Sequence, residues 1–222
     1  MSPKNSMFAT SIGQKFTMGL TGLFLVSFLI VHVSINSLIF LNDGGVSFNA
    51  GAHFMSHNPI IRIVEIGLFA GLVWHIVQAL RLSIKNQNAR PVGYSVQGGS
   101  YNSSWYSRSM GILGSLLLIF LIVHLANFWL PTKQALFKNQ EHNTYENMKN
   151  VFSNGYLVAL YVVGVLSLMY HLLHGFQSAF QSLGINHKRY TPIIRKTGIW
   201  FSVVVCSLFA AMPIALHFNL LN

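Results

Sequence analysis

The stretch FTMGLTGLFLVSFLIVHVSINSLIFLN (16–42) carries no charged side chain, over a length that exceeds the roughly 20 apolar residues a helix needs to cross a bilayer. Four further uncharged stretches follow it, at 66–80, 109–132, 150–187 and 197–222. The stretch at 66–80 is short, but it reaches span length when it is extended back to Pro59, because proline is favoured in the first turn of a helix. The sequence therefore predicts an all-α integral membrane bundle in a single domain (1–222), with five transmembrane helices at 16–41, 59–82, 109–131, 154–182 and 196–219.

The composition agrees with a bilayer as the solvent of this chain. Of its 222 residues, 52% are hydrophobic and 8% are charged, whereas soluble domains carry roughly 25% charged residues. The single cysteine, Cys206, excludes an intramolecular disulfide and an iron–sulfur cluster held by this chain alone. The first apolar run is too long for the core of a cleaved signal peptide, so we expect the first helix to be retained.

Basic residues are distributed unequally between the two sides of the predicted bundle. Ten of the 14 lysines and arginines fall on the side of the N-terminus: Lys4, Lys15, Arg81, Lys85, Arg90, Arg108, Lys188, Arg189, Arg195 and Lys196. The other side carries Arg62, Lys133, Lys138 and Lys149, together with the four acids Asp43, Glu65, Glu141 and Glu146. Because short loops rich in Lys and Arg remain in the cytoplasm, the N-terminus is predicted to be cytoplasmic. Membrane topology thus explains the net charge of +10, and no nucleic-acid partner is expected.

Four of the five predicted helices contain a histidine at a similar distance from the helix start. The segments are FLIVH, ending at His32, GLVWH at His75, LIVH at His124 and LMYH at His171. Each histidine stands 16 to 18 residues into its helix, which is about 24 Å along the axis. Because consecutive helices alternate in direction, His32 and His124 are expected together in the outer half of the membrane, and His75 and His171 in the inner half. Two imidazole pairs at two depths are what axial ligation of two b-type haems requires.

The residues alone leave alternatives open for these histidines. His174 lies three residues after His171 on nearly the same helix face, so depth favours His171 only slightly. An intramembrane histidine also suits a proton relay, which makes a histidine-relay transporter the competing function from a different class. The internal repeats and broken helices typical of secondary transporters are not seen in the sequence.

Glycines near the four histidines are candidates for haem packing. Gly71 precedes His75 by one turn, and Gly175 follows His171 by one turn. Gly22 and Gly114 lie about three turns before the histidine of their own helix, on nearly the same face. These glycines would either give a porphyrin edge clearance or permit close packing of helices.

In these segments the chain resembles the single-subunit, five-helix cytochrome b anchor of succinate:quinone oxidoreductases, the succinate dehydrogenases and fumarate reductases of menaquinone-using bacteria. The segment FNAGAHFMSHNPIIRIVEI (48–66) is similar to the first outer loop and second helix start of that family. The segments that end at His32, His75 and His124 are similar to the first three haem-ligand segments of that family. The segment VGVLSLMYHLLHGFQSAFQSLGI (163–185) is similar to its fourth ligand segment. The family's fourth ligand is the histidine four residues before the glycine, and this rule selects His171 over His174. The resemblance implies the pairing that the depths give, with His75 and His171 at a cytoplasm-proximal haem and His32 and His124 at a distal haem.

The resemblance also implies a function and partners. It implies an electron-carrying subunit of an oxidoreductase complex in the bacterial inner membrane, surrounded by membrane lipid and containing two haem b groups. An iron–sulfur subunit and an FAD flavoprotein subunit would dock on its cytoplasmic face and hold the iron–sulfur clusters and FAD. Menaquinone would be the substrate, with Glu65 and Arg62 in the outer turns of the second helix as quinone-site candidates or as a structural ion pair. The sequence does not distinguish succinate oxidation from the quinol-oxidising direction of a fumarate reductase.

Overall fold

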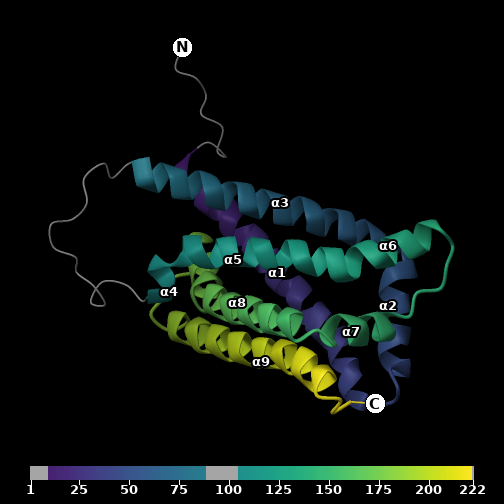
Figure 1. The fold of residues 1–222 in the computed structure, drawn as a ribbon. Helices are drawn as coiled ribbons and strands as arrows, with labels where there is room; N and C mark the ends of the chain where they lie inside the picture. The colour runs from purple at the N-terminus through teal and green to yellow at the C-terminus, as the bar shows by residue number, and fades with distance from the viewer. Residues whose placement is uncertain (1–9, 89–104, 222) are drawn as a thin grey trace.

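The computed structural model describes residues 10–88 and 105–221, and these residues fold almost entirely into helices (Figure 1). Five helical segments are long and apolar enough to cross a membrane: Ile12–Leu41, Pro59–Lys85, Met110–Phe137, Gly155–Ser182 and Thr191–His217. The prediction of an all-α membrane bundle with five transmembrane helices is therefore confirmed. The third segment extends beyond its predicted end at 131, because Pro131 occupies the first turn of a further helix and does not terminate the span.

The spans are built from the following elements. The first comprises α1 (Ser11–Asn36) and a 3-10 turn, η2 (Ser37–Leu41), and the second is α3 (Pro59–Asn88). The third consists of α5 (Met110–His124), a π-helical segment, η4 (Leu125–Trp129), and α6 (Leu130–Phe137). The fourth and fifth are α8 (Gly155–Ser182) and α9 (Thr191–His217). Three short helices lie outside the spans: α2 (Val46–His57), α4 (Trp105–Arg108) and α7 (Thr144–Phe152).

Four of the long helices surround a common interior. Helix α3 packs against α1, α1 packs against α8, and α8 packs against α5. This order places α1 diagonally opposite α5, and α3 diagonally opposite α8. Helix α9 lies outside this group and packs on α8 and α1 (Figure 1).

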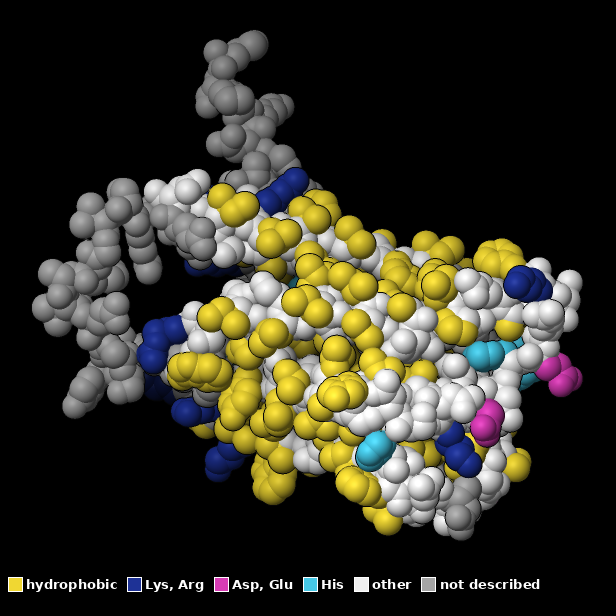
Figure 2. Space-filling model, in the orientation of Figure 1, with side chains coloured by type: hydrophobic (Ala, Val, Ile, Leu, Met, Phe, Trp, Pro, Cys, Tyr) yellow, Lys and Arg dark blue, Asp and Glu magenta, His cyan; other side chains and the backbone are white. Residues whose placement is uncertain are grey.

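The two ends of the bundle differ in charge. Figure 2 shows lysine and arginine side chains gathered at the end where α1 and α9 begin, and acidic side chains at the opposite end. We call these the basic end and the acidic end. Lys4 and Arg90, two of the ten basic residues assigned to the cytoplasmic side, lie outside the described residues. The cytoplasmic position of the N-terminus stays a prediction.

Hydrogen bonds join the short helices α2 and α7 at the acidic end. The Asn49 amide of α2 donates to Asn143 Oδ1 at 3.0 Å, and the backbone N–H of Tyr145 in α7 donates back to Asn49 Oδ1 at 2.9 Å. Phe48 and Tyr145 are both buried in the apolar cluster beneath these helices. His53 and His57 belong to α2, although they fall in the segment whose family resemblance predicts an outer loop.

Close approach of α5 to α8 depends on Gly164. An ideal Cβ on this residue would overlap the ring of Phe120, including its Cγ at 2.5 Å. We expect Gly164→Ala to force these helices apart and to lower the free energy of unfolding by about 1–3 kcal/mol, the usual cost of overpacking. Thermal unfolding of the purified protein in detergent measures this effect. Gly67→Ala on α3 is the matched control, because its Cβ would meet nothing within 4 Å; equal stability of the two variants would contradict the explanation.

Candidate functional site

The four predicted histidines meet as two pairs inside the bundle. The ring centroids of His32 in α1 and His124 in α5 are 5.8 Å apart, and their planes are perpendicular at 90°. The centroids of His75 in α3 and His171 in α8 are 6.3 Å apart, with an interplanar angle of 68°. These are the two combinations that alternating helix direction predicts.

Each pair joins helices that lie diagonally opposite one another. His32 and His124 belong to α1 and α5, whereas His75 and His171 belong to α3 and α8. Two imidazoles that bind one iron from opposite faces have centroids about 6 Å apart, because each metal–nitrogen bond is about 2 Å long. The separations in both pairs fit this requirement.

The pairs occupy different depths. An ideal Cβ on Gly22 of α1 would lie 3.7 Å from Cε1 of His75, which places the His75 pair at the level of Gly22. His32 follows ten residues later on the same helix, about 15 Å further along its axis. The His75–His171 pair therefore lies nearer the basic end and the His32–His124 pair nearer the acidic end.

Two of the four imidazoles have a ring nitrogen without a hydrogen bond. Nδ1 of His124 and Nδ1 of His171 are buried and have no hydrogen-bond partner. A buried polar group without a partner costs about 1–3 kcal/mol, so these rings are not explained as structural hydrogen-bonding residues. In the described part of the chain no group of three or more His, Cys, Asp or Glu forms a metal site. Each pair instead supplies two imidazoles at a separation of about 6 Å, and these are the two donors that a b haem takes from the protein.

Aromatic rings surround the pair near the acidic end. Phe28 stacks on His32 with centroids 5.2 Å apart, and Phe120 stacks on His124 at 5.6 Å. The ring centroid of Tyr161 in α8 lies 6.0 Å from that of His124. These contacts fix the ring positions in an environment that excludes water.

The adjacent residue His174 is placed differently from His171. His171 is the histidine of α8 whose ring lies against His75. His174 is three residues further along the helix, toward the basic end. His171 is thus the α8 histidine that faces His75, and its choice over His174 as a haem ligand stays a prediction.

The four candidate glycines have different surroundings. Gly22 lies beside His75, as noted above, and the Cβ of a residue replacing Gly175 would be 4.0 Å from His171 Cδ2. At Gly71 a Cβ would come 3.1 Å from the ring of Phe24, which is the close helix packing named as the alternative. At Gly114 a Cβ would meet nothing within 4 Å.

Glu65 is the centre of a polar cluster at the acidic end. Lys133 of α6 donates to Glu65 Oε2 at 2.6 Å, and the Trp129 indole N–H donates to Oε1 at 2.6 Å. Nη1 of Arg62 is 4.0 Å from Oε2; it is buried and makes no hydrogen bond. Arg62 and Glu65 thus lie near each other, as their spacing in the sequence suggests. Lys133 and Trp129 are nevertheless closer to the carboxylate than Arg62 is.

A π-helical segment connects this cluster to the histidine pair. The segment Leu125–Trp129 begins directly after His124 and ends at Trp129. Within it the Asn127 amide donates to Tyr161 Oη at 3.2 Å, and the Asn127 carbonyl accepts from the Asn147 amide at 3.0 Å. π-helical turns within α-helices are rare and frequently mark functional sites. This turn joins the two groups over a short length of chain.

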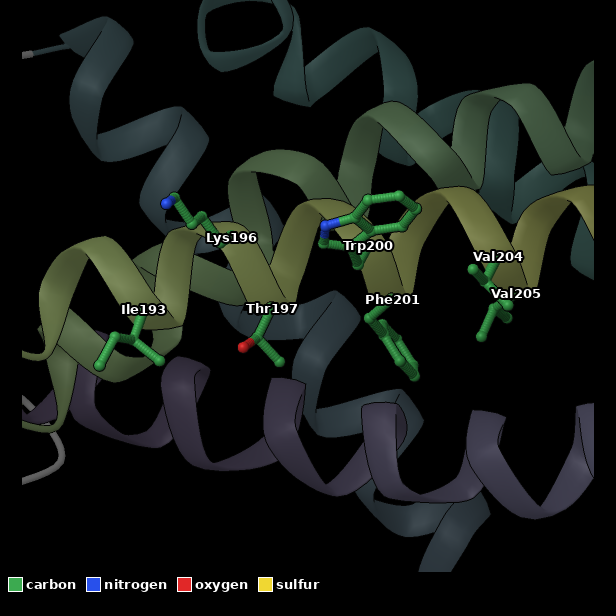
Figure 3. Close-up of a pocket in the computed structure, with 7 residues that line it drawn as sticks. All are labelled: Ile193, Lys196, Thr197, Trp200, Phe201, Val204 and Val205. Carbon is green, nitrogen blue, oxygen red and sulfur yellow. The ribbon is translucent and has the colours of Figure 1, made fainter.

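One hollow of the described surface lies elsewhere. It is about 510 Å³ in volume and is lined by α9 residues from Ile193 to Val205. Figure 3 shows Phe201 pointing toward α1 and Trp200 on the other side of the helix. None of the candidate site residues lines this hollow.

A comparison with curated proteins bears on this arrangement. The chain is 28% identical over 179 residues to the succinate dehydrogenase cytochrome b558 subunit of Bacillus subtilis (strain 168), covering 80% of this chain and 81% of that protein. The resemblance seen in the sequence is confirmed. No family model matches the chain, and no solved structure matches it significantly. The similarity to this cytochrome b subunit and the five spans make the chain a multi-pass protein of the bacterial inner membrane.

Sequence reasoning missed several residues of the site. Trp129 in η4 and Lys133 in α6 lie 64 and 68 residues after Glu65 in the chain, and only the folded bundle brings these side chains to the carboxylate. Thr21 of α1, whose hydroxyl is 3.1 Å from His75 Nδ1, was also missed. The one usable signal was that a carboxylate inside a span requires a cationic partner.

The Glu65–Lys133 ion pair is expected to stabilise the junction of α3 and α6. The Lys133 side chain is 12% exposed and that of Glu65 is 23% exposed, so Lys133→Met leaves a largely desolvated carboxylate. We expect a loss of about 1–3 kcal/mol in the free energy of unfolding, since hydrogen bonds to charged groups are worth that much. Thermal unfolding in detergent is the measurement, with Lys138→Met at an exposed position as control. The double variant Glu65→Gln/Lys133→Met should recover part of the loss; no recovery would refute the pairing.

Proposed function

We propose that this chain is the di-haem cytochrome b anchor subunit of a succinate dehydrogenase, which passes electrons between an iron–sulfur subunit and menaquinone. The observation that carries the proposal is the presence of two imidazole pairs at two depths of a membrane bundle. Similarity to a succinate dehydrogenase cytochrome b558 subunit over four fifths of both chains supports it independently. The chain itself would carry the haem and quinone reactions only, while FAD and the iron–sulfur clusters would belong to the partner subunits.

The residues of the chain have defined tasks in this function. His75 and His171 would hold the haem near the basic end, and His32 and His124 would hold the haem near the acidic end. When bound, each haem supplies an iron that accepts and releases one electron. The aromatic shell around His32 and His124 excludes water, and the diagonal placement of each pair fixes the orientation of its two rings.

The basic end is the face on which the partner subunits would dock. It is the side predicted to be cytoplasmic, and it lies next to the His75–His171 pair. An iron–sulfur subunit bound there would exchange electrons with the nearer haem first. The second haem would then connect this end with a quinone site near the acidic end.

The geometry argues against one of the two competing functions. A histidine-relay transporter needs its imidazoles close enough to exchange protons, but the two pairs lie about 15 Å apart along α1. A fumarate reductase would use the same two pairs and run in the quinol-oxidising direction. The direction of the reaction is set by reduction potentials and quinone type, so the geometry is compatible with either.

Haem content tests the proposal directly. The purified wild-type protein should contain two b-type haems per chain, measured as pyridine haemochrome against protein. His171→Leu should lose one haem because it removes one axial ligand, while His174→Leu should retain both. One haem or none in the wild-type protein, or the reverse behaviour of the two variants, would refute the assignment.

The Glu65 cluster is proposed as part of the quinone site. Arg62 Nη1 is a buried donor without a hydrogen-bond partner, beside the Glu65 carboxylate. A quinone needs a hydrogen-bond donor to its carbonyl and a group that exchanges protons with it. Trp129 links this cluster to the segment that follows His124, which would bring the quinone near the haem held there.

Replacing the carboxylate separates quinone chemistry from haem binding. Glu65→Gln should lower succinate:menaquinone reductase activity about 100-fold or more, within the usual size of a lost proton-transfer group. Haem content and the reduction of an artificial acceptor by succinate should stay at wild-type levels. Glu141→Gln, at an exposed residue of the same end, is the control. Full quinone activity in Glu65→Gln would exclude this carboxylate from the quinone site.

A further inference from the structure

The hydroxyl of Thr21 contacts one of the four imidazoles from a neighbouring helix. Thr21 lies on α1, and its Oγ1 is 3.1 Å from Nδ1 of His75 on α3. The contact is partly buried between the two helices. Gly22, the next residue, provides the space for the same ring, since a Cβ there would be 3.7 Å from Cε1 of His75.

The hydrogen bonds of Thr21 determine which atom carries the proton. Oγ1 of Thr21 is 2.9 Å from the carbonyl oxygen of Thr17 and 3.1 Å from that of Met18. Carbonyl oxygens only accept hydrogen bonds, so the single hydroxyl hydrogen is directed to them. The hydroxyl oxygen then accepts from His75, and the proton of the neutral imidazole is on Nδ1. This tautomer leaves Nε2 with a free lone pair, which is the form that binds a metal.

A second polar contact fixes α1 and α3 one turn away. The Gln78 side chain is 1% exposed, and its Nε2 donates to Thr17 Oγ1 at 3.5 Å. Thr17 and Thr21 are four residues apart, and His75 and Gln78 are three apart, so each pair shares a helix face. Thr17 and Thr21 thus face Gln78 and His75 across the contact between α1 and α3. These two contacts fix how α3 is rotated about its own axis relative to α1.

The other three imidazoles lack such a contact. Nδ1 of His124 and Nδ1 of His171 have no hydrogen-bond partner. Nδ1 of His32 is 3.4 Å from the Asn36 amide, but that amide donates to the His32 carbonyl oxygen at the shorter distance of 2.7 Å. Within the described residues, His75 is therefore the imidazole of the four that a hydroxyl from another helix orients.

We propose that Thr21 is a positioning residue that fixes the tautomer and ring orientation of His75 and thereby tunes the haem held by His75 and His171. This inference rests on the proposed function, because it requires that pair to be the axial ligands. A hydrogen bond accepted from the remote N–H of a ligating imidazole makes the imidazole a stronger donor. A stronger donor stabilises ferric over ferrous iron, so the bond lowers the reduction potential of that haem relative to one whose ligands lack it.

Removal of the hydroxyl at constant shape tests the inference. In Thr21→Val the midpoint potential of one haem should shift to more positive values, and its ferric low-spin EPR signal should change. Haem retention at that site should weaken about tenfold or more, the usual effect of losing such a partner. The affected haem should be the one that disappears in His171→Leu. Thr21→Ser keeps the hydroxyl and should restore the wild-type potential.

The control and the outcomes separate this inference from the function on which it rests. Thr132→Val removes a hydroxyl that donates to the Phe128 carbonyl, at 2.8 Å, and should leave both potentials unchanged. Fewer than two haems in the wild-type protein would overturn the proposed function whatever Thr21 does. Two haems with unchanged potentials and EPR signals in Thr21→Val would overturn the role of Thr21 alone. That role is also overturned if Thr21→Ser shifts the midpoint potential as far as Thr21→Val does. If the valine variant does not accumulate, Thr21→Ala replaces it, and an unchanged midpoint potential in Thr21→Ala would overturn the role as well.

Discussion

The hydrocarbon core of a bilayer offers no hydrogen-bond partner to an imidazole, and the interior of this bundle is arranged around that constraint. Four histidines are placed inside the spans, where a polar side chain is costly unless something binds it. They are brought together as two pairs across the diagonals of four helices. Helices α1 and α3, α1 and α8, and α5 and α8 pack directly along three sides of this arrangement, with Gly71 against Phe24 and Gly164 against Phe120 at the close approaches. Tight packing at the sides is what holds the diagonal imidazoles about 6 Å apart.

The same arrangement relates the histidine pair near the acidic end to the ionisable cluster beyond it. The π-helical turn at 125–129 inserts an extra residue into the helical repeat. It therefore rotates Trp129 about the helix axis relative to the position that a regular α-helix would give this residue. The insertion leaves the Asn127 carbonyl available to the Asn147 amide of α7. It also directs Trp129 at Glu65. The short helices α2 and α7 at the acidic end therefore stabilise the π-helical turn, and this turn positions Trp129 beside Glu65 in the proposed quinone site.

Much of this architecture could be predicted from the sequence, because it depends on one-dimensional quantities. The absence of charge located four of the five spans, and the second needed the helix-start signal of Pro59 as well. Counting residues from the start of each helix predicted both histidine pairs. The rest depends on how helices rotate and pack sideways. Thr21 could not be predicted because a threonine in an apolar span ordinarily bonds only its own backbone. The sequence places Lys133 beyond the third span, since nothing in it indicates that this span continues through Pro131 to Phe137. It likewise suggests a loop where α2 forms, because those 12 residues include several polar side chains and fall between two spans.

The two histidine pairs offer the same kind of ligand, so a difference between the haems proposed for them would come from their surroundings. His75 has a hydroxyl on its remote nitrogen, whereas His124 and His171 have no partner there. The His32–His124 pair is enclosed by Phe28, Phe120 and other rings, and such an apolar shell disfavours the extra positive charge of a ferric haem. A hydrogen-bonded ligand favours that charge. In the proposed function the hydrogen bond at His75 would therefore lower the reduction potential of a haem near the basic end, and the apolar shell would raise that of a haem near the acidic end. The charges of the two ends act against both effects, because lysines and arginines favour the reduced form of a nearby haem and carboxylates favour its oxidised form. The difference between the two haems is thus a balance between local contacts and the charge of each end.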